Sequence, residues 1–250
     1  MNYNICVALR VKSASLSEIK PLLDKGIKKK PNFIEFRFDY IDNVQSLSLD
    51  FVKDLLNIIN HRIPVIFTFR DSSEGGQSNI TQEEHFKILK MFIEAKPEYI
   101  DIEMSTEEIF LYDFITLASQ NGINLICSYH NFEKTDNLED TINLISNFND
   151  KLVQNASLIS DTDSKIIIKV ISTAQTFKDN IIPLKLCKHF TNFPRKLISF
   201  CMGETGIFSR IMCVTVGSFF TYATIEEKTA PGQLPIDQMR EIYNLFPNSL

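Results

Sequence analysis

The chain lacks several features that would place it in a familiar class. Its 26 Lys and Arg residues are outnumbered by 31 Asp and Glu, and the net charge of −5 provides no basic surface for nucleic acid. No apolar run reaches the ~18 residues of a membrane-spanning helix. The first residues, MNYNICVALRVKS, carry no signal-peptide pattern. We therefore expect a cytoplasmic protein with neither a nucleic-acid nor a membrane partner.

Motifs for metal and phosphate binding are also missing. The 4 His residues are scattered, without the H-x-x-x-H pair that is typical of zinc sites. The sequence contains no P-loop. The 5 cysteines form no C-x-x-C pair and are typical of reduced, buried thiols. These patterns predict no metal site and no structural disulfide.

The chain does contain a regular alternation of short β-rich runs and amphipathic helical patterns. The runs start about 30 residues apart and predict strands over 4–10, 33–39, 64–70, 99–104, 124–130, 165–171, 196–202 and 218–224. Helices are predicted over 81–95, 105–122, 137–153 and 236–246. The first two open on predicted capping boxes, Thr81 with Glu84 and Ser105 with Glu108, and Gly122 is expected to end the second.

Alternating strands and helices predict right-handed crossovers and a parallel sheet. Eight such units in 250 residues match the size of a single (β/α)8 TIM barrel of the α/β class. We expect one catalytic domain over 1–250, since no linker or shift in composition divides the chain. A doubly wound open sheet is the runner-up, although the Gly-rich turn after its first strand is absent.

The polar residues of the predicted strands share one face. In the strand 33–39, Glu35, Arg37 and Asp39 alternate with apolar residues, and side chains two apart share a face. A half-solvated antiparallel sheet would alternate too, but it would not explain the intervening helices. In a barrel the polar face is the lumen, whose C-terminal mouth holds the active site. The pattern predicts a polar cup there, formed by Glu35, Arg37, Arg70, Asp101, Glu103, His130 and Lys169.

One lysine of this cup interrupts the apolar run IIIKVIST (166–173). Burial and the nearby Arg37 and Arg70 are expected to favour a neutral Lys169 amine, which is a nucleophile that forms Schiff bases with carbonyls. His130 is the candidate base for the proton that an iminium acidifies. Lys165 shares the parity of Lys169 but lies at the end of the strand that barrels do not use for catalysis.

Several segments, in order along nearly the whole chain, resemble type I 3-dehydroquinate dehydratase of the shikimate pathway. They are EFRFD (35–39), TFRDSSEGG (68–76), IDIE (100–103), SYHNFEKT (128–135), KVISTA (169–174), MGETGIFSR (202–210) and TAPGQ (229–233). The resemblance implies a (β/α)8 barrel that forms a homodimer and uses no cofactor or metal. It also implies a hydro-lyase that converts the small-molecule substrate 3-dehydroquinate to 3-dehydroshikimate by syn elimination.

The resemblance further implies roles for the site residues. Lys169 would form the Schiff base with the C3 ketone, His130 would take the C2 proton and later protonate the departing C1 hydroxyl, and Glu74 would orient His130. Arg210 would be the main carboxylate clamp. The substrate-binding residues would be Glu35, Arg37, Arg70, Arg210, Thr229, Gln233 and Met202. The lid segment is often SAPGQ in this family; Thr229 keeps the hydroxyl and adds a methyl group.

Two other functions share parts of this pattern. A class I aldolase or transaldolase also uses a Schiff-base lysine in a barrel, and would need a phosphate-binding turn near the last two strands, for which MGETG (202–206) is the available segment. A catalytically inert binding barrel would leave Lys169 unreactive. The intact set of Lys169, His130 and Glu74 argues against an inert barrel.

Overall fold

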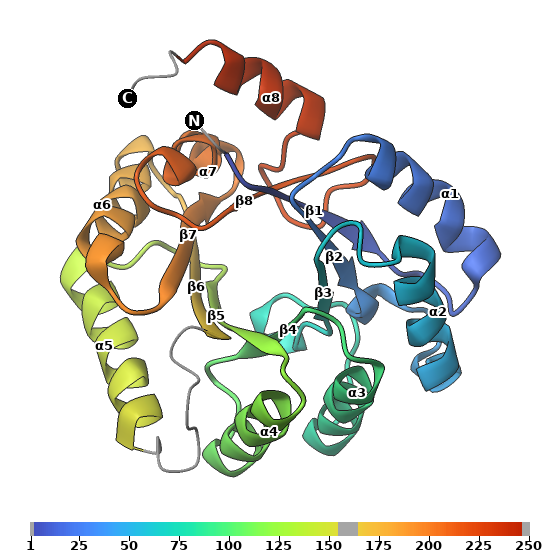
Figure 1. Cartoon of the computed structure of the whole chain (residues 1–250). Coiled ribbons are helices and arrows are strands. Elements are labelled where there is room, and N and C mark those ends of the chain that lie inside the picture. The colour runs from blue at the N-terminus through green and yellow to red at the C-terminus, as the bar shows by residue number, and fades with distance from the viewer. Residues whose placement is uncertain (1–2, 155–164, 247–250) are drawn as a thin grey trace.

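The computed structural model describes residues 3–154 and 165–246. Eight parallel strands form one sheet in the order β7-β6-β5-β4-β3-β2-β1-β8, and the sheet curls into a nearly closed barrel inside a ring of helices (Figure 1). The expected (β/α)8 barrel is confirmed. The strands are β1 Ile5–Arg10, β2 Phe33–Arg37, β3 Val65–Thr68, β4 Tyr99–Glu103, β5 Asn124–Asn131, β6 Ile166–Thr173, β7 Lys196–Met202 and β8 Thr221–Ala223.

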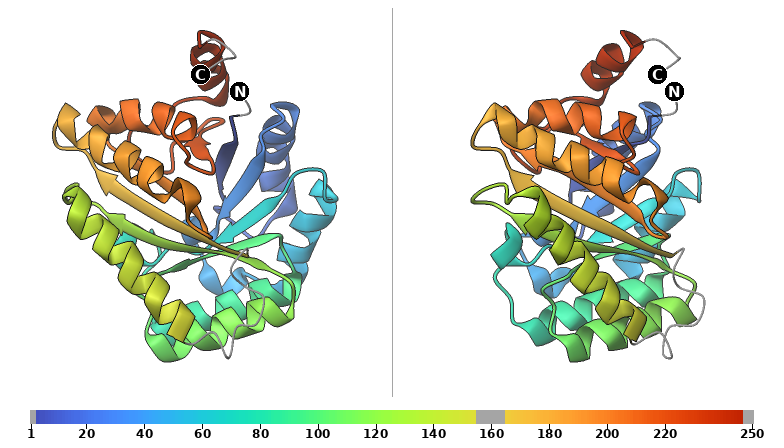
Figure 2. Two further views of the ribbon diagram at one scale, coloured as in Figure 1. Left: turned by 60° about the vertical axis from the view of Figure 1, so that its left-hand side comes forward. Right: turned by 90° about the vertical axis from the view of Figure 1, so that its left-hand side faces the viewer.

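The helices lie outside the strands in chain order (Figure 2). Because they cover only the outer face of the sheet, the alternative of a doubly wound open sheet is wrong. The helices are α1 Leu16–Lys28, α2 Leu49–Ile59, α3 Gln82–Ala95, α4 Glu108–Gln120, α5 Leu138–Gln154, α6 Ile181–His189, α7 Ile207–Met212 and α8 Ile236–Asn244.

The barrel closes between β7 and β8 through a few contacts rather than a full ladder, since β8 has only 3 residues. The backbone N–H of Phe219, just before β8, donates to the Leu197 carbonyl of β7 at 2.8 Å. The Ser199 N–H donates to Ser218 Oγ at 3.3 Å. These contacts bring Tyr222 of β8 to the same mouth as the residues of β7.

The alternation of the strand residues separates an outer core from an inner one. Ile34, Phe36 and Phe38 pack in the outer core with helix residues such as Phe92. The inner core fills the lumen with residues that include Cys6, Ala8, Phe33, Ile66, Ile126, Ile167 and Ile198. The polar cup lies beyond these apolar residues, toward the C-terminal mouth of the barrel. This is the arrangement that the shared face of the polar strand residues predicts.

Helix starts were predicted with mixed success. The capping box of Thr81 and Glu84 is confirmed at the start of α3, and Gly122 follows α4 with a φ of +74°. The predicted capping box of Ser105 and Glu108 is wrong, because α4 begins at Glu108 after an N-cap without a side-chain bond. Ser105 Oγ instead donates to Glu74 Oε1 at 2.8 Å, so this hydroxyl supports the polar cup.

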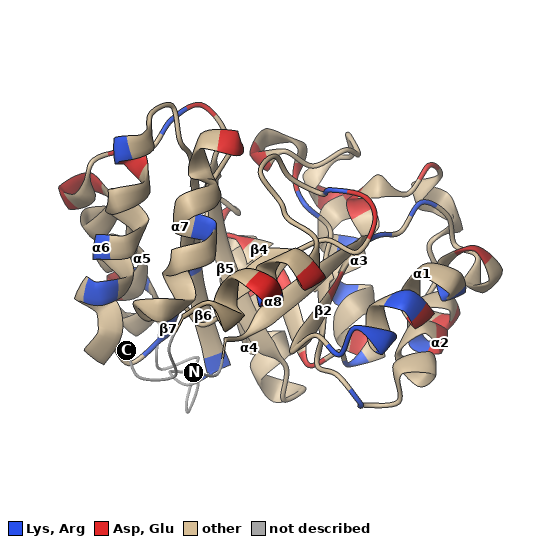
Figure 3. Ribbon diagram, turned by 90° about the horizontal axis from the view of Figure 1, so that it is seen from above, with Lys and Arg blue, Asp and Glu red and all other residues tan. Residues whose placement is uncertain are grey.

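Charged residues of both signs are interspersed along the ribbon, with neither sign gathered on one side (Figure 3). Of the helices that the structure describes, none combines the length and the apolar character needed to cross a membrane.

Candidate active site

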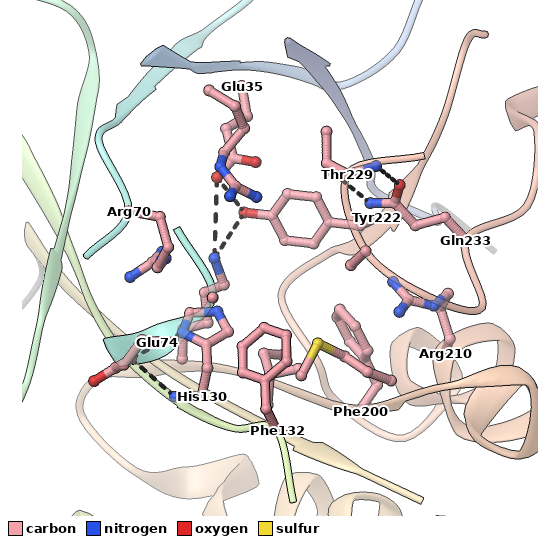
Figure 4. A pocket seen from close by; sticks show the side chains of 16 residues that line it. Glu35, Arg70, Glu74, His130, Phe132, Phe200, Arg210, Tyr222, Thr229 and Gln233 are labelled. Carbon is pink, nitrogen blue, oxygen red and sulfur yellow. Dashed lines mark hydrogen bonds and ion pairs between the residues drawn. The ribbon is translucent and has the colours of Figure 1, made fainter. Parts of the chain in front are cut away.

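A pocket opens among the C-terminal ends of the strands (Figure 4). It encloses about 450 Å³, counting space open to solvent, and all the predicted catalytic and substrate-binding residues line it together. Its lining is Glu35, Arg37, Arg70, Glu74, Gly75, His130, Phe132, Lys169, Ile171, Phe200, Met202, Arg210, Tyr222, Thr229, Ala230 and Gln233. Asp101 and Glu103, also expected in the cup, are buried and contact it from outside this lining.

Lys169 is only 4% exposed, and its amine faces the polar cup. Lys169 Nζ donates to Asp101 Oδ2 at 2.9 Å and to the Tyr222 hydroxyl at 3.3 Å, and it lies 3.9 Å from Glu35 Oε1. From the sequence, Arg37 and Arg70 are the charges expected to act on this amine. The arginines do line the pocket, but the direct ion-pair partners of the amine are carboxylates.

Asp101 connects Lys169 to Arg70. Its Oδ1 atom accepts from Arg70 Nη2 at 2.7 Å and from Ser128 Oγ at 2.6 Å, while Oδ2 accepts from Lys169. Burial acts to raise the pKa of Asp101, but the charges of Arg70 and Lys169 and its hydrogen bonds outweigh burial, and the pKa is lowered. Asp101 is therefore a carboxylate that holds two buried cations.

Arg70 is fixed by further protein contacts. Its Nη1 donates to Glu103 Oε1 at 2.5 Å and to Ser128 Oγ at 2.7 Å. Burial opposes the charge of Arg70, yet Asp101 and Glu103 raise its pKa well above the usual value. Arg70 thus presents a rigid positive surface to the pocket, and it remains a cation at every physiological pH.

His130 and Glu74 form a hydrogen-bonded pair at the end of β5. Glu74 Oε2 lies 3.0 Å from His130 Nδ1 and also accepts the His130 backbone N–H at 3.0 Å. Glu74 belongs to a short helix, Ser72–Glu74, which ends at Gly75 with a φ of +83°. A Cβ on Gly75 would meet the Phe132 ring, so glycine permits both the turn and the close packing.

The environment of this pair shifts both pKa values. Burial, and then the charges of Arg70, Lys169 and Arg37, lower the pKa of His130 well below its usual value. Burial raises the pKa of Glu74 to about 7, against the opposing charge of Arg70. His130 is consequently a neutral imidazole near neutral pH, which is the form that accepts a proton.

Arg210 of α7 is a buried cation, only 1% exposed. Among the described residues no carboxylate lies within ion-pair distance of it; its Nη2 donates to the Pro231 carbonyl at 3.1 Å, and its guanidinium carbon lies 4.4 Å from the Phe200 ring centroid. Burial lowers the pKa of Arg210 to about 10. A guanidinium in this setting has the capacity to pair with an anion.

The segment TAPGQ folds over the pocket and is held closed by its own contacts. The Thr229 N–H donates to Gln233 Oε1 at 2.7 Å, and Gln233 Nε2 donates back to Thr229 Oγ1 at 2.8 Å. The Gly203 N–H donates to the Pro231 carbonyl at 3.3 Å. The predicted lid residues therefore lie at the mouth, in contact with the loop after β7.

Arg37 and Glu35 of β2 complete the polar side of the pocket. Arg37 makes a bidentate ion pair with Asp39 at 2.7 and 2.9 Å, which raises its pKa above the usual value despite burial. Glu35 Oε1 accepts from Thr68 Oγ1 at 2.9 Å and from the Tyr222 hydroxyl at 3.1 Å.

Tyr222 is a polar residue of the pocket that the sequence analysis does not predict. It lies on β8 with its ring in the inner core, and its hydroxyl bridges Lys169 and Glu35. The strand parity used for the earlier strands would have found it in SFFTYAT (218–224). The apolar wall beside Met202 also includes Phe132, Ile171 and Phe200.

A TIM barrel whose mouth joins a buried lysine, a histidine–glutamate pair and an arginine without a carboxylate partner among the described residues has the composition of an active site. Comparison with known proteins narrows this class. The family model described as type I 3-dehydroquinase matches residues 5–249. The chain therefore belongs to the type I 3-dehydroquinase family, which confirms the family and the enzyme class expected from the sequence.

Individual relatives agree with this membership. The chain is 33% identical over 223 residues to a 3-dehydroquinate dehydratase of Desulfotalea psychrophila, covering 86% of this chain and 87% of the relative. It is 28% identical over 228 residues to that of Pyrococcus abyssi, covering 91% and 94%. In fold it resembles the solved type I 3-dehydroquinate dehydratase of Clostridium difficile, with a TM-score of 0.82, 24% identity and coverage of 99% and 93%.

Within residues 3–154 and 165–246, no group of three or more His, Cys, Asp or Glu side chains is arranged to hold a metal ion.

Proposed function

We propose that this chain dehydrates 3-dehydroquinate to 3-dehydroshikimate through a Schiff base on Lys169. The observation that carries the proposal is that Arg210, a buried cation without a carboxylate partner among the described residues, lines the same pocket as Lys169 and His130. Such a pocket suits a small substrate that bears both a carboxylate and a ketone.

In the first step, Lys169 Nζ attacks the C3 carbonyl carbon, and the carbonyl oxygen leaves as water to give an iminium ion. Asp101 and Tyr222 hold the amine through hydrogen bonds of 2.9 and 3.3 Å. Contacts from two sides limit the directions in which Nζ can point, which supports an aligned attack. The iminium then withdraws electrons from C2 and makes its proton acidic.

In the second step, His130 removes the C2 proton, and the electron pair moves toward the iminium nitrogen. The imidazolium then donates that proton to the C1 hydroxyl, which departs as water while the C1–C2 double bond forms. Glu74 supports this role by binding Nδ1, which directs Nε2 to the substrate. Hydrolysis of the imine returns free Lys169 and releases the conjugated ketone.

Binding of the substrate would depend on Arg210 and the lid. The guanidinium would take the substrate carboxylate as a charge-assisted, bidentate partner. Glu35, Arg37 and Arg70 would receive the hydroxyl groups, Met202 would pack against the ring, and Thr229 with Gln233 would cover it. The bond from Arg210 to Pro231 links the clamp directly to the lid.

The alternative of an aldolase or transaldolase requires a phosphate site in MGETG. The glycines of this segment have other uses in the structure. A Cβ on Gly206 would come within 2.8 Å of the Cys201 backbone, and Gly203 contacts the lid. These packing roles favour a dehydratase over a phosphate-binding barrel.

Borohydride reduction in the presence of 3-dehydroquinate tests the proposal. We expect covalent labelling of one lysine, loss of labelling and turnover in Lys169→Ala, and retention of both in Lys165→Ala, whose side chain lies just before β6. Sugar phosphates should give no label. Labelling that persists in Lys169→Ala, or a label from sugar phosphates alone, would refute the assignment. Formation of the 3-dehydroshikimate enone, followed by its absorbance, gives the turnover.

We further propose that residues 1–250 act as one catalytic domain and assemble as a homodimer. An exposed apolar pair supports an interface on the outer surface: Phe177 and Phe208 are 61% and 39% exposed, and their ring centroids lie 5.3 Å apart. Light scattering on the Phe177→Ser variant, compared with the parent chain, tests this interface.

The cytoplasmic location stays a prediction, supported by 5 free, buried cysteines (Cys6, Cys127, Cys187, Cys201 and Cys213).

A further inference from the structure

A second pocket lies beside the active site and shares none of its lining residues. We call it the side pocket; it is formed by the segments that follow β3 and β4 together with α3 and α4. It encloses about 570 Å³, counting space open to solvent, and is lined by Asp71, Ser73, Gln82, His85, Phe86, Leu89, Glu103, Ser105, Thr106 and Phe110.

Two polar atoms of residues that line the side pocket are buried without a hydrogen-bond partner among the described residues. They are Glu103 Oε2 and His85 Nε2, from side chains whose residues are 2% and 9% exposed. The other carboxylate oxygen of Glu103, Oε1, accepts hydrogen bonds from Arg70 Nη1 at 2.5 Å and from the Asp71 N–H at 3.1 Å. Buried polar groups are nearly always paired, so a ligand that supplies partners to both atoms would be favoured here.

His85 Nε2 can accept a hydrogen bond in the tautomer that carries its proton on Nδ1. In this structure His85 Nδ1 lies 3.9 Å from Asp71 Oδ2, so a proton there faces a carboxylate. Nε2 is then an acceptor, like Glu103 Oε2. A ligand that satisfies both atoms must therefore donate at least two hydrogens from one end.

The charge of the lining residues favours a cationic ligand. Two of its residues, Asp71 and Glu103, are acidic, and no Lys or Arg lines the side pocket. A metal ion does not fit, because no cluster of three or more His, Cys, Asp or Glu suited to a metal occurs in the part of the chain that the structure describes.

Part of the lining of the side pocket is apolar. Phe86 and Phe110 pack with ring centroids 5.0 Å apart, and Leu89 lies on the same helix as Phe86. A ligand with a charged donor at one end and an apolar or aromatic body would match both the acidic and the apolar residues of this lining.

We propose that the side pocket binds a primary ammonium group carried on an apolar or aromatic body. The ammonium donates to Glu103 Oε2 and His85 Nε2, and the body packs against Phe86, Leu89 and Phe110. The bound amine would contact residues that support the active site, because Glu103 also holds Arg70 and Ser105 also bonds Glu74.

Benzylamine, as a probe at neutral pH, tests the proposal in the intact protein. Titration calorimetry should show benzylamine binding about tenfold or more tightly than benzyl alcohol, since hydrogen bonds from a charged donor are the stronger ones, and benzoate should not bind. In NMR spectra, benzylamine should shift the ring signals of His85 and leave those of the exposed His61 unchanged.

Two matched variants, at His85 and at the exposed His61, test whether benzylamine binds in the side pocket. His85→Phe keeps a ring against Phe69 but removes Nε2, and should weaken benzylamine binding about tenfold. His61→Phe, at a side chain that is 83% exposed, should not. Equal binding of benzylamine and benzyl alcohol, unmoved His85 signals, or unchanged affinity in a folded His85→Phe protein would each overturn the proposal. These measurements need no turnover, so they are independent of the proposed dehydratase activity.

Discussion

The Tyr222 hydroxyl accepts a hydrogen bond from Lys169 Nζ at 3.3 Å and donates one to Glu35 Oε1 at 3.1 Å. It therefore joins the proposed nucleophile to a carboxylate of the neighbouring wall. Burial raises the pKa of Tyr222 well above its usual value, and the charge of Glu35 adds to this effect. Tyr222 thus stays protonated at working pH: its hydroxyl donates to Glu35 and accepts from Lys169, which limits how the lysine can move.

Tyr222→Phe should slow formation of the imine without unfolding the barrel. The ring contacts with Phe220 and Phe200, at centroid distances of 5.3 and 6.1 Å, can be kept, while Lys169 loses one of its two hydrogen-bond partners. We expect kcat to fall about tenfold, since a lost hydrogen bond of this kind is worth roughly 1–2 kcal/mol. The rate of borohydride trapping measures the effect directly.

Tyr243→Phe is the matched control, because Tyr243 is also buried and its hydroxyl donates to the Ile211 carbonyl at 2.9 Å, away from the pocket. It should lose similar stability and keep its trapping rate. Equal trapping rates in Tyr222→Phe and the parent chain would show that the hydroxyl does not position the lysine.

Asp101→Asn should destabilise the fold more than any surface ion pair does. Asp101 is a carboxylate shared by Arg70 and Lys169, and an amide in its place leaves two buried cations without it. Removing one partner of a buried network costs about 3–5 kcal/mol. The free energy of unfolding in urea should fall by this amount.

The comparison variant is Asp237→Asn, which breaks the exposed ion pair between Asp237 and Lys29. It should change the free energy of unfolding by about 1 kcal/mol or less. If the two substitutions cost the same, Asp101 does not hold the buried cations in the manner described.

Glu74→Gln should remove the decrease in the free energy of unfolding that accompanies ionisation of Glu74 as the pH rises. The pKa of Glu74 rises from an ordinary 4.5 to about 7 in the folded protein, chiefly through burial. The folded state therefore binds this proton more tightly than the unfolded chain, and stability contributed by the protonated form is lost as pH rises from about 4.5 to 7. A shift of this size corresponds to up to about 3 kcal/mol.

The substituted glutamine keeps the shape and can still accept from the His130 N–H while it bonds Ser105. Glu74→Gln should accordingly raise the melting temperature at pH 8 and leave it nearly unchanged at pH 4. If kcat requires an ionised Glu74 to hold the proton on His130 Nδ1, the activity of the parent chain should rise through pH 7. A variant that is destabilised at pH 8 would contradict the raised pKa.

The sequence predicted the barrel and its polar face because both follow from local periodicity. The alternation of Ile34, Phe36 and Phe38 with Glu35 and Arg37 already assigns each side chain to the helices or to the lumen. Arg210, Thr229 and Gln233 lie outside the strands and no periodicity points to them, so their assignment depended on their place in the loops after the last two strands and on the resemblance to a family.

Pairing inside the cup could not be predicted in the same way. Lys169 meets Asp101 because β5 sets the register between β4 and β6, pairing Asp101 with Ile126 and Ser128 with Lys169. This stagger depends on the closure of the whole barrel. Ser105 was misassigned for a related reason: its hydroxyl could cap α4 or bond Glu74, and only the position of Glu74 in the fold decides between them.

Gly232→Ala should open the lid and weaken substrate binding. Gly232 has a φ of +75°, and a Cβ there would lie 2.2 Å from the Gly203 carbonyl oxygen, so the lid must move away from the loop that it covers. The contacts of the Pro231 carbonyl with Gly203 and Arg210, at 3.3 and 3.1 Å, would then be lost. We expect KM for 3-dehydroquinate to rise about tenfold or more, with a smaller change in kcat.

Gly122→Ala separates this clash from the backbone cost of an alanine at positive φ. Gly122 has nearly the same φ, +74°, but a Cβ there would have no atom within 4 Å. Both variants should lose about 1 kcal/mol of stability from the left-handed backbone, whereas only Gly232→Ala should change KM. Because the two glycines differ mainly in what surrounds them, an equal KM in both variants would mean that the closed lid does not contribute to binding.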